Sequence, residues 1–162
     1  TLPAASAADV VRRQRRSDDG MTTIAWDGKT LAVDRASWQG HLCSDAQKLY
    51  RIDRLQAWYA AAGDEALVQR VIRWLRTGTS ESIPEKEQEH SFGLLVNERG
   101  EVFRVSGYLE LAKIEKAPVS DGAGAPIAIG AMLAGADAIQ AIAIAERCSD
   151  VARDCNFIRI MK

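Results

Sequence analysis

The order of segments along the chain predicts an α+β fold in which helices cover the faces of stacked β-sheets. Three observations lead to this prediction: an early hairpin, one long amphipathic helix, and a late pair of small-residue helices followed by a final strand. A sheet or helix with one apolar face has to bury that face against another element, and this requirement favours layers. At 162 residues, the chain is long enough to form one hydrophobic core.

The early hairpin is predicted over residues 22–35. Asp27 and Gly28 separate two alternating apolar runs, 22–26 and 29–35. Asp-Gly between such runs is a strong signal for a tight turn between antiparallel strands, because glycine accepts the positive φ that the turn requires. The chain is therefore expected to fold back on itself at this point.

The first residues differ in character from the hairpin. Ser6 before an alanine-rich run predicts the start of a short helix, and the arginines of 12–16 are expected near its C-terminal end. Met21 directly precedes the hairpin. We therefore divide the chain into an N-terminal leader or arm, 1–21, and a domain, 22–162.

The middle of the chain contains one ambiguous segment and one clear helix. Residues 48–62 fit both the spacing of a helix and the alternation of a strand, so the pattern leaves both structures open. After them, Asp64 is a suitable cap for a helix whose broad apolar face runs over 67–75. Gly78 is expected to end this helix.

The second half of the chain predicts a hairpin, a pair of helices and a last strand. The hairpin covers 91–105, and 108–117 continue its sheet. Pro126 lies in the first turn of one helix, and Asp137 opens a capping box for the next. The last strand is predicted over 156–161.

Charge and composition argue against some classes of partner. The chain has 21 basic and 22 acidic residues, so the whole molecule carries no field suited to nucleic acid or to an anionic membrane, and neither is expected as a partner. No apolar run approaches the roughly 20 residues that cross a bilayer, and the start of the chain lacks the apolar stretch of a secretion signal. These features favour a cytoplasmic location.

The cysteines and histidines give no sign of a metal site. Cys43, Cys148 and Cys155 are odd in number and lack the spacing of metal ligands, which indicates reduced thiols that serve as packing residues. Neither His41 nor His90 has a partner at a suitable spacing. We therefore expect neither a metal ion nor a cofactor.

Several landmarks follow one another as they do in proteasome β-type subunits, in particular those of the HslV peptidase group. They are paired threonines, an Asp-Arg pair, a lysine and two longer segments: Thr22-Thr23, Asp34-Arg35, Lys48, 58–66 and 122–126. The first longer segment resembles the place where a strand delivers the oxyanion amide and a helix begins. The second resembles the glycine-serine-glycine turn before the helix pair of the family.

This resemblance implies a four-layer αββα sandwich of stacked antiparallel sheets, the fold of the N-terminal nucleophile hydrolases. In that family a threonine at the start of its own chain attacks a peptide carbonyl, and its α-amine, with a pKa of about 7.7 to 8.0, takes the proton. Matched to this sequence, Thr22 is the nucleophile. Lys48 is the cation that lowers the pKa of the amine and of the hydroxyl, and Asp34 is the carboxylate that holds the lysine.

The resemblance also implies supporting residues around these three. Arg35 and Ser37 are expected to shape the site. A backbone amide near Ala61 or Ala62 is expected to stabilise the oxyanion of the tetrahedral intermediate. No cofactor takes part in this chemistry.

The sequence departs from the family pattern in four places. Ala123 replaces a serine whose hydroxyl helps to relay the proton, and the first hairpin is shorter than the family's. Thr22 carries a peptide bond while 1–21 precede it, so activity is expected only after trimming to Thr22. The terminal turn also differs from the family's, and Asp150 in that turn is the position expected for a second supporting acid.

Two functions fit these observations. The first is a threonine-type peptidase of a homo-oligomeric ring, with a peptide substrate and an unfoldase as a partner. The second is a catalytically inactive proteasome-like fold that serves as a structural or assembly component of a phage particle or a cage, docked through 1–20. The apolar face of 67–75 and the small-residue helices of 126–147 give ring assembly a physical motive.

Overall fold

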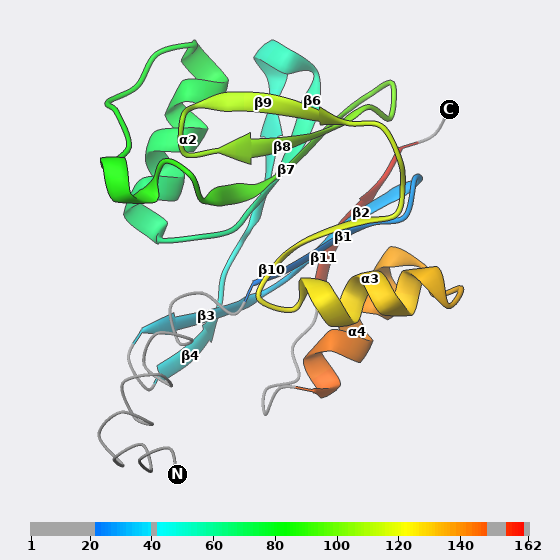
Figure 1. Cartoon of the computed structure of the whole chain (residues 1–162). Coiled ribbons are helices and arrows are strands. Elements are labelled where there is room, and N and C mark those ends of the chain that lie inside the picture. Colours follow the sequence, from blue (N-terminus) through cyan, green and yellow to red (C-terminus); the bar gives the residue numbers. More distant parts are fainter. Residues whose placement is uncertain (1–21, 40–41, 149–154, 161–162) are drawn as a thin grey trace, which may run out of the picture.

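The computed structural model of this chain describes residues 22–39, 42–148 and 155–160. These residues form a mixed α+β fold with several antiparallel sheets and three α-helices (Figure 1). The leader or arm of 1–21 and the position of Asp150 lie outside the described residues.

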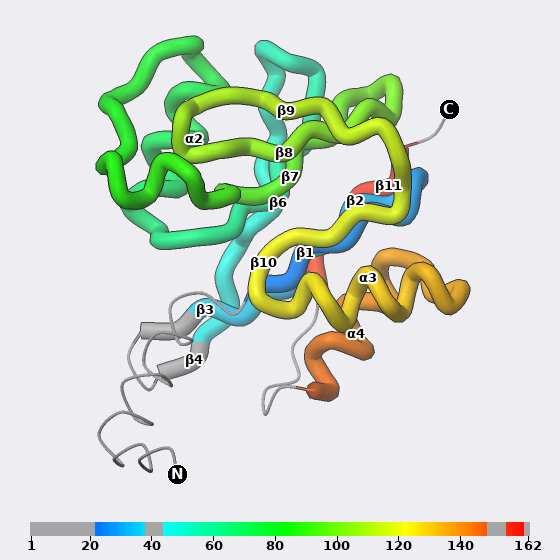
Figure 2. Tube along the Cα trace, in the orientation of Figure 1, coloured from blue at the N-terminus to red at the C-terminus, as the bar shows by residue number. Residues whose placement is uncertain are grey.

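A four-stranded antiparallel sheet contains the first hairpin. Its strand order is β10-β1-β2-β11. The strands are β1 (Thr23–Trp26), β2 (Thr30–Asp34), β10 (Val119–Gly122) and β11 (Cys155–Arg159). Strand β11 therefore lies beside β2 although most of the chain separates them in sequence (Figure 2).

The turn of the first hairpin differs by one residue from the predicted one. The register pairs Trp26 with Leu31, and the Asp27 amide donates to the Thr30 carbonyl at 3.3 Å. The two central residues are therefore Gly28 and Lys29, and Gly28 has a φ of 98°. A turn with glycine in its first central position fits the twist of the strands.

A five-stranded sheet follows in which neighbours along the chain are neighbours in space. Its strands are β5 (Leu49–Ile52), β6 (Ala57–Ala61), β7 (Ser91–Asn97), β8 (Val102–Ser106) and β9 (Glu110–Ile114). A short 3₁₀ turn, η1 (Asp53–Leu55), connects the first two. The ambiguous segment 48–62 is therefore two strands. In sequence, a separate hairpin comes after β2 and before β5; it consists of β3 (Ala36–Gln39) and β4 (Leu42–Asp45).

The three helices begin and end close to the predicted residues. They are α2 (Glu65–Thr77), α3 (Ala125–Leu133) and α4 (Ala138–Arg147). The Asp64 carboxylate accepts the first amides of α2, Gly78 ends that helix with a φ of 83°, and Asp137 forms the predicted capping box of α4. Another short 3₁₀ turn, η2 (Glu85–Glu87), precedes β7. Among the described residues, none of the helices has the length and apolar character needed to cross a membrane.

Buried apolar side chains form three clusters that show how the elements pack. One lies between α2 and the five-stranded sheet, one between the two sheets, and one between the four-stranded sheet and the pair α3 and α4. The two sheets therefore face each other, and the helices cover their outer faces (Figure 1).

The alternation of β1 and β2 explains this packing. Large side chains such as Trp26 and Leu31 point to the other sheet, whereas Ala25 and Ala32 point to the helices. Alanine on the helix side lets α4 approach the sheet closely, and both strands are buried along their whole length.

One sequence-based argument for assembly is wrong. The apolar face of 67–75 is not free for a partner, because Val68, Val71, Ile72 and Leu75 are buried against the five-stranded sheet. The helix pair keeps exposed apolar residues. Leu133 is 72% exposed, and Ile127 and Ile144 are each 38% exposed.

Candidate active site

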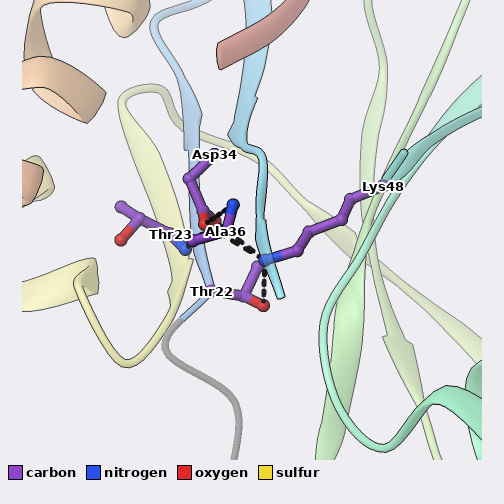
Figure 3. A network of polar contacts seen from close by, with 5 residues as sticks. All are labelled: Thr22, Thr23, Asp34, Ala36 and Lys48. Carbon is purple, nitrogen blue, oxygen red and sulfur yellow. Dashed lines mark hydrogen bonds and ion pairs between the residues drawn. The ribbon is translucent and has the colours of Figure 1, made fainter. Parts of the chain in front are cut away.

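The structure brings Thr22, Asp34 and Lys48 together at a point where the two sheets meet (Figure 3). Thr22 directly precedes β1, Asp34 ends β2, and Lys48 directly precedes β5 of the other sheet. The Lys48 Nζ lies 3.0 Å from Thr22 Oγ1 and 3.1 and 3.3 Å from the two carboxylate oxygens of Asp34. The shorter first hairpin therefore still places the hydroxyl beside the ammonium.

Asp34 is held in place by the backbone around it. Its Oδ1 accepts the Thr23 amide at 2.7 Å, and its Oδ2 accepts the Ala36 amide at 3.0 Å. The Asp34 side chain is 3% exposed and that of Lys48 is 12% exposed. A charge-assisted interaction with this little solvent is screened much less than a surface pair.

A glycine-rich turn packs against Thr22 and Thr23 from β10. Gly122 pairs with Thr23 across the sheet, and a Cβ at Gly122 would overlap the carbonyl oxygen of Thr22. A Cβ at Gly124 would overlap the Thr23 hydroxyl. Both glycines are therefore required for the close approach. Ala123 between them is exposed and offers no hydroxyl.

The two alanines expected to supply an oxyanion donor have both amides engaged. The Ala61 amide donates to the Lys48 carbonyl at 2.8 Å, and the Ala62 amide donates to the Phe92 carbonyl at 3.0 Å. In the described part of the chain, the next amide, that of Gly63, has no hydrogen-bond partner. Gly63 is exposed and has a φ of 119°.

Two other predicted residues lie at the β3–β4 hairpin, since Arg35 directly precedes β3 and Ser37 is part of it. The Arg35 guanidinium lies 4.0 Å from an Asp45 carboxylate oxygen, and the Arg35 carbonyl accepts the Ala46 amide. Ser37 pairs with Ser44 across this hairpin. No hydrogen bond or ion pair between these side chains and Lys48 is found within 22–39 and 42–148.

Sequence reasoning missed a second polar cluster beside the glycine turn. The Asp121 carboxylate accepts hydrogen bonds from the Ser91 hydroxyl and, at 2.7 Å, from the Gly122 amide, and it lies 4.0 Å from Arg104 Nε. Asp121 and Ser91 are separated by 30 residues and belong to different sheets. No local pattern or motif in the sequence marks this pair.

The arrangement limits which group can take a proton from Thr22. A lysine ammonium has donors and no acceptor, so Lys48 donates to Thr22 Oγ1 and cannot remove its proton in the charged form. A base has to come from another group next to the hydroxyl. Among the described residues, no group of three His, Cys, Asp or Glu side chains could hold a metal ion.

No protein-family model matches this chain, and a search of the curated proteins finds no match for it.

Proposed function

We propose that the chain, once it begins at Thr22, is a threonine-type peptide-bond hydrolase related to proteasome β and HslV subunits. One observation carries the proposal: a buried ammonium, Lys48, lies within hydrogen-bond distance of both Thr22 Oγ1 and the Asp34 carboxylate. A threonine hydroxyl is a weak nucleophile that needs such a setting. Trimming would give Thr22 a free α-amine, the base that Lys48 cannot be.

The packing of the elements supports the same family. The order helix, sheet, sheet, helix pair is what a four-layer αββα sandwich of the N-terminal nucleophile hydrolases requires. The first hairpin supplies the strand that begins at the nucleophile. We propose that the fold is of this type.

In the proposed reaction, the Thr22 α-amine takes the proton of Oγ1, and the oxygen attacks the peptide carbonyl carbon. The tetrahedral intermediate collapses, the C–N bond breaks, and the proton passes to the leaving amine. An ester on Thr22 remains. Water, activated by the same amine, hydrolyses this ester and restores the hydroxyl.

The neighbouring residues have defined tasks in this reaction. Lys48 lowers the pKa of the α-amine and stabilises charge on Oγ1, while Asp34 keeps the ammonium in position. We assign the oxyanion donor to the Gly63 amide, because the amides of Ala61 and Ala62 are used within the sheet.

The alternative is a catalytically inactive structural or assembly component. The observation that favours it is the lack of a hydroxyl at Ala123, where the family has its supporting serine. In this function the exposed apolar residues of α3 and α4 would contact other copies in a cage or phage particle. Ring assembly, an unfoldase partner and a cytoplasmic location belong to the first proposal.

Hydrolysis by the trimmed chain distinguishes these functions. A chain that begins at Thr22 should hydrolyse members of a set of short fluorogenic peptides, and the same chain with Thr22→Ser should retain activity because the hydroxyl and the amine remain. Thr22→Ala should have no activity while folding and assembling normally. Equal turnover by the trimmed chain and its Thr22→Ala variant would contradict the hydrolase and leave the structural function.

A further inference from the structure

We infer that Asp121, through its hydrogen bond to Ser91, is a positioning residue that sets the separation of the two sheets beside Thr22. The inference rests on the proposed function, since it names residues that align the site for that reaction. Neither residue touches the reacting atoms. Both would act through the backbone on either side of the site.

Asp121 is placed to join the sheets. It lies on β10 of the four-stranded sheet, and its Oδ2 accepts the hydroxyl of Ser91, the first residue of β7 in the other sheet. Its Oδ1 accepts the Gly122 amide at 2.7 Å, and Arg104 Nε lies 4.0 Å from Oδ2. The Asp121 side chain is only 14% exposed, so little water competes for these contacts.

On the β10 side, the residue next to Asp121 lies directly against Thr22. Gly122 follows Asp121 and pairs with Thr23, and the absence of a Cβ at Gly122 lets its backbone lie against the Thr22 carbonyl. An added Cβ at Gly122 or at Gly124 would overlap Thr22 or Thr23, so the turn and the strand are in close contact. A shift of Asp121 would therefore move the backbone that carries the hydroxyl.

On the β7 side, the residue next to Ser91 is hydrogen-bonded to β6 and to the residue that follows that strand. Ser91 lies next to Phe92, whose carbonyl accepts both the Ala62 amide at 3.0 Å and the Tyr59 hydroxyl. A Cβ at Gly93 would overlap the Ala60 carbonyl oxygen, so β7 and β6 are in close contact here. The position of Ser91 is thus coupled to the segment that leads to Gly63.

The Lys48 side chain crosses between the same two sheets, but it is a weaker restraint on their separation. Its four-carbon stem has several rotatable bonds and can follow a small shift, whereas the Ser91 and Asp121 side chains are short. A displacement of about 1 Å at a reacting group can cost about a hundredfold in rate. Of these two polar contacts between the sheets, the short Ser91–Asp121 contact is therefore the tighter restraint on how Thr22 faces the Gly63 amide.

Substitutions at Ser91 test the inference in the chain trimmed to Thr22. Ser91→Ala removes the hydroxyl and should lower kcat by about tenfold or more while KM stays within about twofold, because substrate binding is unaffected and alignment is lost. Ser91→Thr keeps the hydroxyl and should restore most of kcat. Ser91→Cys, a weak donor of similar size, is the second disrupting variant should Ser91→Ala fail to fold.

Ser106→Ala is the matched control. Ser106 pairs with Ser91 across β7 and β8, and its buried hydroxyl has no hydrogen-bond partner in the part of the chain that the structure describes. This variant removes the same group from the neighbouring position. It should leave kcat, KM and the position of Thr22 unchanged.

A second measurement does not depend on activity. The NMR resonance of the Thr22 γ-methyl group should move in Ser91→Ala and stay in place in Ser91→Thr and Ser106→Ala. A wild-type kcat in Ser91→Ala, or an unmoved Thr22 resonance, overturns the inference. Should the trimmed wild-type chain hydrolyse nothing, the proposed function fails, and the Thr22 resonance alone decides whether the Ser91–Asp121 contact positions Thr22.

Discussion

Asp34 combines two roles at the scale of single residues. Its carboxylate neutralises the buried Lys48 ammonium and accepts the amides of Thr23 and Ala36. The ion pair and the two backbone contacts thus depend on the same side chain. Loss of Asp34 would leave a charge and two amides without their acceptor.

Asp34→Ala should lower the free energy of unfolding by about 3 to 5 kcal/mol, as expected when one partner of a buried ion pair is removed. Urea unfolding of the full chain and of its Asp34→Ala variant measures this loss. Arg51→Ala is the control, because it breaks solvent-exposed pairs with Asp53 and Glu98 and should cost far less than the loss of the buried pair. Equal losses in the two variants would contradict the buried pair.

Tyr59 is expected to make the free energy of unfolding depend on pH in the alkaline range. It is fully buried, and its hydroxyl donates to the Phe92 carbonyl. Burial is the largest cause that raises the pKa of Tyr59 well above 10.0, with smaller contributions from Tyr50 and Asp121. The folded state therefore favours the neutral phenol. This contribution to stability is complete below the pKa of the unfolded chain and is lost as the pH rises through the folded pKa.

Tyr59→Phe should accordingly be less stable than the wild type by about 1 kcal/mol at pH 9, because one buried hydrogen bond is lost. The difference should shrink as the pH rises above about 10, since only the wild type has to keep this phenol protonated. Urea unfolding at three alkaline pH values measures it. A difference that stays constant with pH would contradict a raised pKa.

Only part of the site could be predicted at this scale. The meeting of Thr22, Asp34 and Lys48 followed from the resemblance, since the family motif fixes their order. The spacing of these three residues in the sequence does not by itself show that they meet. Asp121 and Ser91 were missed because they lie on strands of different sheets and have no local signature. The engaged amides of Ala61 and Ala62 depend on strand pairing, which a sequence does not display.

At the scale of elements, Asp27 joins the first hairpin to helix α4. Its Oδ1 accepts the Lys29 and Thr30 amides at 2.8 Å, and its Oδ2 accepts the Ala138 amide at 2.9 Å. Asp137, the residue directly before α4, caps the same helix. The start of α4 is thus attached both to its own cap and to the turn of the sheet that it covers.

Asp27→Ala should lower the free energy of unfolding by about 2 kcal/mol, since amides in the turn and in α4 lose their acceptor. Hydrogen exchange at Ala138 should become faster. Asp137→Ala, an ordinary cap removal, should cost about 1 kcal/mol and leave the hairpin turn protected. Unchanged exchange at Ala138 in Asp27→Ala would show that the turn does not hold the helix.

The sequence predicted elements best where the signals are local. The caps of α2 and α4 involve neighbouring residues, and both helices begin as predicted. The segment 48–62 was ambiguous because its apolar residues satisfy both periodicities. Pairing of β6 with β5 inside the segment and with β7 makes it part of a sheet, and β7 lies far from the segment in sequence.

At the scale of the whole molecule, an amphipathic pattern indicates burial but not the partner. The α2 face is buried inside the domain, whereas Leu133 of α3 is 72% exposed. Both helices looked equally suited to an interface in the sequence. If the chain assembles with copies of itself, α3 and α4 are the helices with apolar surface left to bury.

Light scattering tests this assembly. The chain at micromolar concentration should form particles larger than the 17.7 kDa monomer, and Leu133→Glu should shift them towards monomer because a charge replaces an exposed apolar side chain. Tyr108→Ser, at a residue that is 52% exposed beside the other sheet, should leave assembly unchanged. A monomeric wild-type chain would rule out the proposed ring.

The most direct test of the proposed activity is capture of Thr22 by an electrophile. A chain that begins at Thr22 is incubated with N-capped tripeptide vinyl sulfones bearing apolar, basic or acidic terminal residues, and its intact mass is measured. We predict a mass increase of one inhibitor, located at Thr22 by peptide mapping and missing from Thr22→Ala. No adduct with any of the probes, or the same adduct on Thr22→Ala, would contradict the proposal that this hydroxyl is the nucleophile.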